Sequence, residues 1–124
     1  MQKQSFGSYL RMLRLSRSPG ITQEALAKAV GRSKMTISQF EQEKNAPPQG
    51  ALLDSFVSAL SLSDEEEGMF RFLAAESRCA MPEDVQDYFF ENPSIYDAIR
   101  AAKKSNVNDT VWHEIAQKFK DSAR

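Results

Sequence analysis

The hydrophobic positions recur with helical spacing along the chain, and no stretch alternates between apolar and polar residues as a β-strand would. Phe6, Leu10 and Leu13 lie at i, i+4 and i+7, which predicts a first helix over about residues 5–16. A second, shorter helix is predicted over residues 23–29, after a loop that contains proline and glycine. The pattern is typical of an all-α protein.

The third predicted helix differs from the others because most of its residues are polar. It covers about Ser33 to Lys44 and begins at a serine that can cap it. On a helical wheel Ile37, Phe40 and Glu41 lie on one side. Two large apolar side chains, at roughly 2 kcal/mol each when buried, leave the helix dependent on its neighbours. Its opposite face is therefore a candidate for contacts outside the chain.

Five more helices are expected after Asn45-Ala46-Pro47-Pro48, the segment that should end the third. The fourth contains the apolar residues from Leu52 to Leu60. The fifth begins with a capping box at Ser63 and continues to about Arg78. The last three begin near Pro82, Pro93 and Asp109, with a polar loop over residues 103–107. The following positions of these three helices are expected to face inward: Val85, Tyr88, Phe89, Ile95, Tyr96, Ile99, Ala102, Trp112, Ile115, Ala116 and Phe119.

Charge is unevenly distributed along the 124 residues, although the net charge is only −1. Residues 1–50 contain eight Lys/Arg and three Asp/Glu (+5), residues 51–92 two and ten (−8), and residues 93–124 six and four (+2). A basic N-terminal part is typical of a chain whose one end meets a polyanion. The acidic segment should lie away from such a partner. The alternative is that these charges merely lie on solvated helix faces.

Spacing adds to this interpretation. Gln23, Ala27, Gly31, Ile37 and Phe40 occur in the register of two helices joined by a tight glycine turn, which is the helix-turn-helix. The segment TQEALAKAVGRSKMTISQFEQEKNAPP resembles the Cro/CI-type (XRE) helix-turn-helix family of phage and bacterial repressors. The resemblance implies an all-α, lambda-repressor-like domain over residues 1–62, followed by a C-terminal helical extension over residues 63–124.

The resemblance also implies roles for individual residues. Arg14 and Glu41 would form a structural ion pair between the first and third helices. Gln23 would bind a phosphate and support the third helix, while Lys34, Met35 and Gln39 would face bases. The residue type of Lys34 is equally suited to a phosphate contact. The complete set of residues expected to contact DNA is Gln23, Arg32, Ser33, Lys34, Met35, Thr36, Ser38, Gln39, Gln42 and Lys44.

Other classes of protein find little support in the sequence. We find no phosphate-binding glycine loop and no metalloprotease or nucleophile-elbow motif, so we expect neither an enzyme nor a cofactor. The lone Cys79 has no partner for a metal site, and the lone His113 is typical of a surface residue. No apolar run approaches the roughly 20 residues of a membrane span, and a cytoplasmic location is expected.

The expected function is therefore sequence-specific binding of double-stranded DNA by a homodimeric transcriptional regulator, a repressor, that reads the major groove with the helix from about Ser33 to Glu43. One alternative is an antitoxin, in which residues 63–124 bind a protein partner. A second is an adaptor that retains the fold without binding DNA. The basic N-terminal part and the polar face of the third helix argue against the adaptor.

Overall fold

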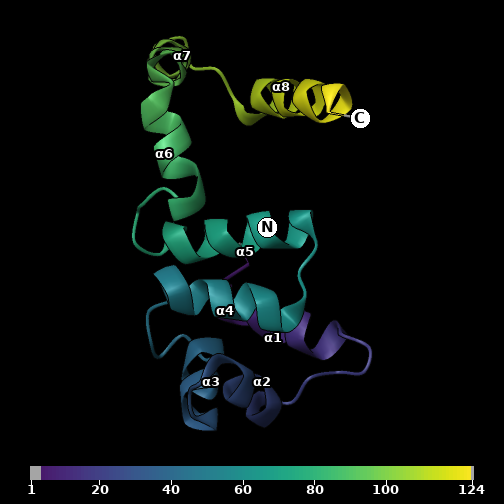
Figure 1. Ribbon diagram of the computed structural model, residues 1–124. Coiled ribbons are helices and arrows are strands. Elements are labelled where there is room, and N and C mark those ends of the chain that lie inside the picture. Colours follow the sequence, from purple (N-terminus) through teal and green to yellow (C-terminus); the bar gives the residue numbers. More distant parts are fainter. Residues whose placement is uncertain (1–3, 124) are drawn as a thin grey trace. The chain divides into compact units, whose positions relative to one another are not determined.

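The computed structural model describes residues 4–123, which form eight α-helices and no strand (Figure 1). The all-α prediction is confirmed. The helices are α1 (Phe6–Ser16), α2 (Gln23–Val30), α3 (Lys34–Glu41), α4 (Gly50–Leu60), α5 (Asp64–Glu76), α6 (Glu83–Glu91), α7 (Pro93–Lys104) and α8 (Asp109–Ser122). The chain divides into two compact units, a first that ends at Val85 and a second that begins at Gln86.

The core of the first unit is built by α1 to α5 around a series of aromatic rings. Phe6 and Phe70 lie 4.8 Å apart between ring centroids, Phe56 and Phe70 6.5 Å, and Phe40 and Phe56 5.8 Å. Phe56 and Phe70 are completely buried. Leu73 and Ala74 of α5 belong to the same core. The compact unit therefore extends beyond the domain limit expected at residue 62, because α5 packs on α1 through these side chains.

The third helix is shorter than predicted. It ends at Glu41, with Gln42 as its C-cap, whereas the sequence indicated a helix to about residue 43 or 44. Glu43 adopts a left-handed conformation, with φ of 61°, and its carboxylate Oε1 accepts a hydrogen bond of 2.6 Å from the backbone N–H of Gly7. Gly7 lies in the first turn of α1, where backbone N–H groups have no partner within the helix. The contact between Glu43 and the start of α1 thus ends α3 before Pro47 and Pro48 are reached.

An ion pair joins the end of α1 to the start of α5. Arg17 Nη2 lies 2.7 Å from Glu66 Oε2, and Arg17 Nη1 also donates to the carbonyl oxygen of Leu60 at 3.1 Å. Glu66 completes the capping box with Ser63 that the sequence predicted. The hydrogen bond from Arg17 lowers the pKa of Glu66 from 4.5 to about 2, assisted by the backbone N–H of Ser63. The start of α5 is therefore held both locally and by α1.

The second unit contains no buried residue in the part that the structure describes, residues 86–123. Several positions that the sequence predicted to face inward are exposed, including Tyr88 at 64%, Ile99 at 44% and Phe119 at 71% of their surface. Val85, at the end of the first unit, and Tyr96 are likewise exposed, while Trp112 is only half-buried. The prediction was wrong here because the apolar side chains of α6, α7 and α8 line an open groove and do not enclose a core. α7 also continues to Lys104, into the predicted loop.

None of the described helices combines the length and the apolar character needed to cross a membrane.

Candidate nucleic-acid interface

The turn between α2 and α3 is built from local signals in the sequence. The Thr22 hydroxyl caps α2 by accepting the backbone N–H of Ala25 at 3.0 Å. Gly31 ends this helix in the left-handed conformation, with φ of 71°, which glycine adopts without a steric penalty. Ser33 then caps α3 by accepting the backbone N–H of Thr36 at 3.2 Å. Within the first unit, α2 and α3 lie side by side (Figure 1).

The inner face of α3 is fixed by two apolar side chains and one buried ion pair. Ile37 is completely buried and Phe40 nearly so. Arg14 Nε donates to Glu41 Oε2 at 2.7 Å, and Arg14 Nη2 donates to Glu41 Oε1 at 3.0 Å. This bidentate pair joins α1 to α3. Its two side chains are only 8% and 4% exposed, so little water screens it.

The ion pair has further partners that position α2. Arg14 Nη1 donates to the carbonyl oxygen of Ile21 at 2.9 Å, just before α2. Gln23 Nε2 donates to Glu41 Oε1 at 3.0 Å, from the first residue of α2. A buried pair with its remaining donors and acceptors satisfied holds a defined geometry. The network therefore fixes the orientation of α3 relative to α1 and α2. Gln23 thus contacts the last residue of α3, and its contact with phosphate stays a prediction.

The outer face of α3 presents side chains that can contact a partner. Met35 is 69% exposed, and Lys34 and Gln42 are also exposed. Thr36, Ser38 and Gln39 are half-buried. Gln42 Nε2 donates to Ser38 Oγ at 2.9 Å, so these two side chains are held relative to each other.

Gln39 is held by a residue that the sequence analysis did not select. Asn45 Nδ2 donates to Gln39 Oε1 at 2.9 Å. This contact orients the amide of Gln39 from outside the helix. Asn45 follows the left-handed Glu43, and no periodicity of the sequence indicates that the chain turns back toward α3 there.

The remaining predicted contacts lie at the two ends of α3. Arg32 is exposed in the turn, and its guanidinium donates to the neighbouring carbonyl of Gly31 at 3.0 Å. Ser33 is occupied as the cap, and its hydroxyl lies 3.0 Å from that of Thr36. Lys44 is exposed after the helix. The two cations thus lie at opposite ends of the α3 surface.

A polar hollow of about 520 Å³ lies at the N-terminal ends of α2 and α3. It is lined by Arg11, Arg14, Thr22, Gln23, Glu24 and Lys34. Arg11 was missed by the sequence analysis, although it precedes Arg14 by one helical turn. Helix N-termini carry partial positive charge and exposed N–H groups, so cations at this position add to a field that attracts anions.

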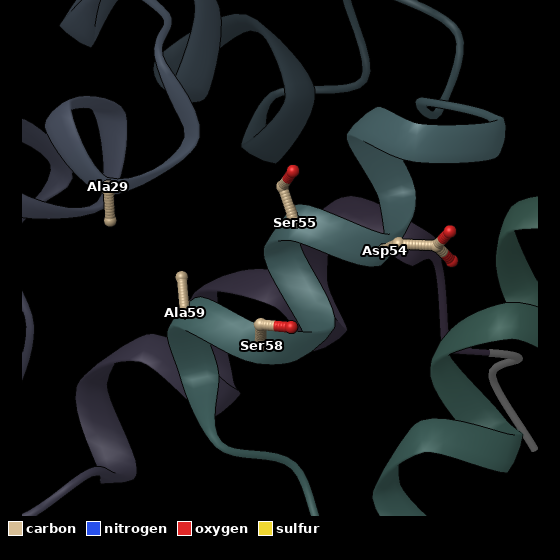
Figure 2. A pocket seen from close by; sticks show the side chains of 5 residues that line it. All are labelled: Ala29, Asp54, Ser55, Ser58 and Ala59. Carbon is tan, nitrogen blue, oxygen red and sulfur yellow. The ribbon is translucent and has the colours of Figure 1, made fainter.

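A second hollow of the first unit, of about 420 Å³, offers much less chemistry (Figure 2). In Figure 2 the methyl groups of Ala29 on α2 and Ala59 on α4 point toward each other, and Ser55 and Ser58 add only hydroxyls. Asp54 points away from them and pairs with Arg71 at 2.8 Å. Small side chains here allow α2 and α4 to approach, and we assign no ligand to this hollow. Within residues 4–123, no group of three or more His, Cys, Asp or Glu side chains could hold a metal ion.

Two capped helices, a left-handed glycine between them and a second helix with a buried inner face and a free polar outer face define the helix-turn-helix class of protein. A family model described as a helix-turn-helix domain matches residues 5–68, which is just over half of the chain. The chain belongs to this family. Comparison with curated proteins and with solved structures gave no significant match.

Proposed function

We propose that the protein binds double-stranded DNA in a sequence-specific manner and regulates transcription as an XRE-type repressor, with α3 in the major groove. The observation that carries this proposal is the outer face of α3, which is held rigidly from behind by the Arg14–Glu41–Gln23 network. Base reading requires side chains whose geometry is fixed in advance. Gln39, oriented by Asn45, offers an amide of the kind that pairs with adenine.

Contacts with the DNA backbone would lie beside this face. Lys34 and Arg11 border the hollow at the N-terminal ends of α2 and α3, where phosphate oxygens find both N–H donors and positive charge. Arg32 and Lys44 extend the basic surface along α3. Phosphate contacts fix position and supply salt-dependent affinity, whereas base contacts supply specificity. Met35 would contact an apolar base edge, such as the methyl group of thymine.

The proposed regulator is a homodimer. One recognition helix contacts only a few base pairs, whereas two copies about 34 Å apart can read both halves of a palindrome. In each copy the basic residues 1–50, with a charge of +5, suit contact with DNA better than the acidic residues 51–92, with a charge of −8.

Fluorescence anisotropy would test DNA binding directly. The protein is titrated into labelled DNA from upstream of its own gene and into a scrambled duplex, at two salt concentrations. We expect tighter binding to the upstream DNA, and affinity for both duplexes that falls steeply as salt increases. Absence of binding to either duplex would overturn the proposal.

Single substitutions separate the two kinds of contact. Gln39→Ala should cost about 1–3 kcal/mol on the preferred site and little on scrambled DNA. Lys34→Ala should weaken binding on both duplexes if Lys34 contacts phosphate. Gln117→Ala, which removes the same amide from α8, is the matched control and should leave both affinities unchanged. Equal loss on both duplexes for Gln39→Ala would remove its role in base reading.

The antitoxin alternative is favoured by one observation, the exposed apolar side chains of residues 86–123. In that case a small toxin gene should lie beside this one, and its product should co-purify with the chain. A purified chain that binds its upstream DNA and retains no toxin would favour the repressor.

A further inference from the structure

The second unit contains an open apolar groove of about 740 Å³. All three helices contribute to it: Tyr88 comes from α6, Ile95 and Ile99 from α7, and Trp112, Ile115 and Phe119 from α8. None of the residues that line it carries a charge. Tyr88 and Phe119 remain 64% and 71% exposed at its edge. Groups of exposed apolar side chains of this kind mark interaction surfaces in proteins that are otherwise soluble.

We propose that the groove binds the same groove of a second copy, so that the chain dimerises through α7 and α8. This names the surface of the homodimer proposed above. Trp112, Ile115 and Phe119 follow the i, i+3, i+7 spacing of a bundle seam, and Ile95 and Ile99 face the groove from α7. In such a dimer, α8 of each copy would pack against the apolar residues of the groove in the other copy, and the two units together would form a shared helical core.

Size is the first argument for an obligatory partner. The second unit has 39 residues, 86–124, with no cysteine among them, and none of its described residues is buried. Units below about 40 residues usually need a disulfide, a metal or oligomerisation to be stable. The single cysteine of the chain, Cys79, lies outside this unit.

Area is the second argument. Tyr88 and Phe119, which line the groove, are 64% and 71% exposed. With roughly 200 Å² per aromatic side chain, their exposed parts amount to about 270 Å² in each chain. Two copies could therefore cover about 540 Å² with these two side chains, roughly half of what a specific interface requires, and Ile99, which is 44% exposed in the same groove, adds to that area.

Charge favours a second copy as the occupant over a strongly charged partner. Residues 86–124 contain six acidic and six basic side chains, so two copies do not repel each other. On α7, Asp97 precedes Arg100, Lys103 and Lys104. On α8, Asp109 and Glu114 precede Lys118 and Lys120, with Asp121 as the exception. Antiparallel helices from two copies related by a twofold axis would place acidic ends beside basic ends. A strongly acidic or basic partner would find no such match.

Trp112 makes this proposal testable without DNA, because it is the only tryptophan of the chain and lines the groove. The full chain is diluted while tryptophan emission is recorded, and sedimentation velocity gives the oligomeric state over the same range. We expect a dimer whose dissociation coincides with a red shift of the emission. Phe119→Asp should weaken self-association by about 30-fold or more. His113→Asp places the same charge on the opposite face of α8 and should leave it unchanged.

Several results would overturn the interface. A dimer that persists in Phe119→Asp, with emission independent of concentration, would place the dimer contact elsewhere and leave the proposed DNA binding intact. A monomer with blue-shifted emission at all concentrations would show that the chain covers its own groove. A monomer with red-shifted emission would show that the groove is empty. A monomer whose emission shifts to the blue only when a co-purified protein is added back would identify a different partner.

Discussion

The two units of this protein have the same apolar content but only one of them has a core. Residues 1–85 contain 35 residues of the apolar and aromatic types and residues 86–124 contain 16, which is 41% in each case. The first unit nevertheless buries three phenylalanine rings, Phe6, Phe56 and Phe70, almost completely, whereas the second buries nothing that the structure describes. Composition therefore does not decide burial. The first unit has five helices that enclose a centre, whereas the helices of the second leave their apolar side chains around an open groove.

Deleting one ring from each unit should show this difference most strongly. Phe70→Ala removes a completely buried ring and should lower the free energy of unfolding by about 3–5 kcal/mol. Phe119→Ala, at a protein concentration low enough for the chain to be monomeric, should change it by less than about 0.5 kcal/mol, because its ring is 71% exposed. Urea unfolding followed by circular dichroism measures both. Comparable losses in the two variants would mean that the second unit has a core of its own.

A smaller effect is expected from two glycines of the first unit. A Cβ on Gly7 would overlap the backbone oxygens of Phe40 and Glu41, where α1 crosses the end of α3. Gly7→Ala should therefore destabilise the protein by about 1–3 kcal/mol. Gly68, inside α5, has no atom within 4 Å of an added Cβ. Gly68→Ala should stabilise the protein by up to about 1 kcal/mol, because alanine is the better helix former.

Thermal unfolding of the two glycine variants provides the measurement. Opposite shifts in melting temperature would confirm that close packing of α1 against α3 is specific to the Gly7 site. A neutral Gly7→Ala would show that α1 and α3 can move apart without loss.

The smallest effect concerns pH and the contact between α1 and α5. The pKa of Glu66 is lowered from 4.5 to about 2 by Arg17, so the ionised carboxylate stabilises the folded state above pH 4.5. That contribution should be lost as the pH falls from about 4.5 toward 2. It should be modest, since the Glu66 and Arg17 side chains are 30% and 20% exposed. The free energy of unfolding of Glu66→Gln should depend less on pH over this range than that of the wild type. An identical pH dependence would show that other carboxylates account for the acid sensitivity.

Much of the first unit could be predicted from local patterns. The caps at Thr22, Ser33 and Ser63 and the left-handed Gly31 are short-range features, each decided within four residues by hydrogen bonds to the adjacent backbone. The inward positions Ile37 and Phe40 follow from helical periodicity. The surface around α3 was harder to predict. Asn45 and Arg11 join it only because Glu43 reverses the chain and because α1 lies beside the ends of α2 and α3.

The sequence by itself determined that the chain is helical, where most helices begin, and which residues of α3 turn inward, since these properties depend on contacts between near neighbours. Only the tertiary structure decided that α3 ends at Glu41, that α5 completes the first core, and that the apolar stripes of α7 and α8 remain open. Those outcomes depend on which distant segments meet. A periodic apolar stripe specifies a face to be covered, but it does not specify whether the same chain or another copy covers it.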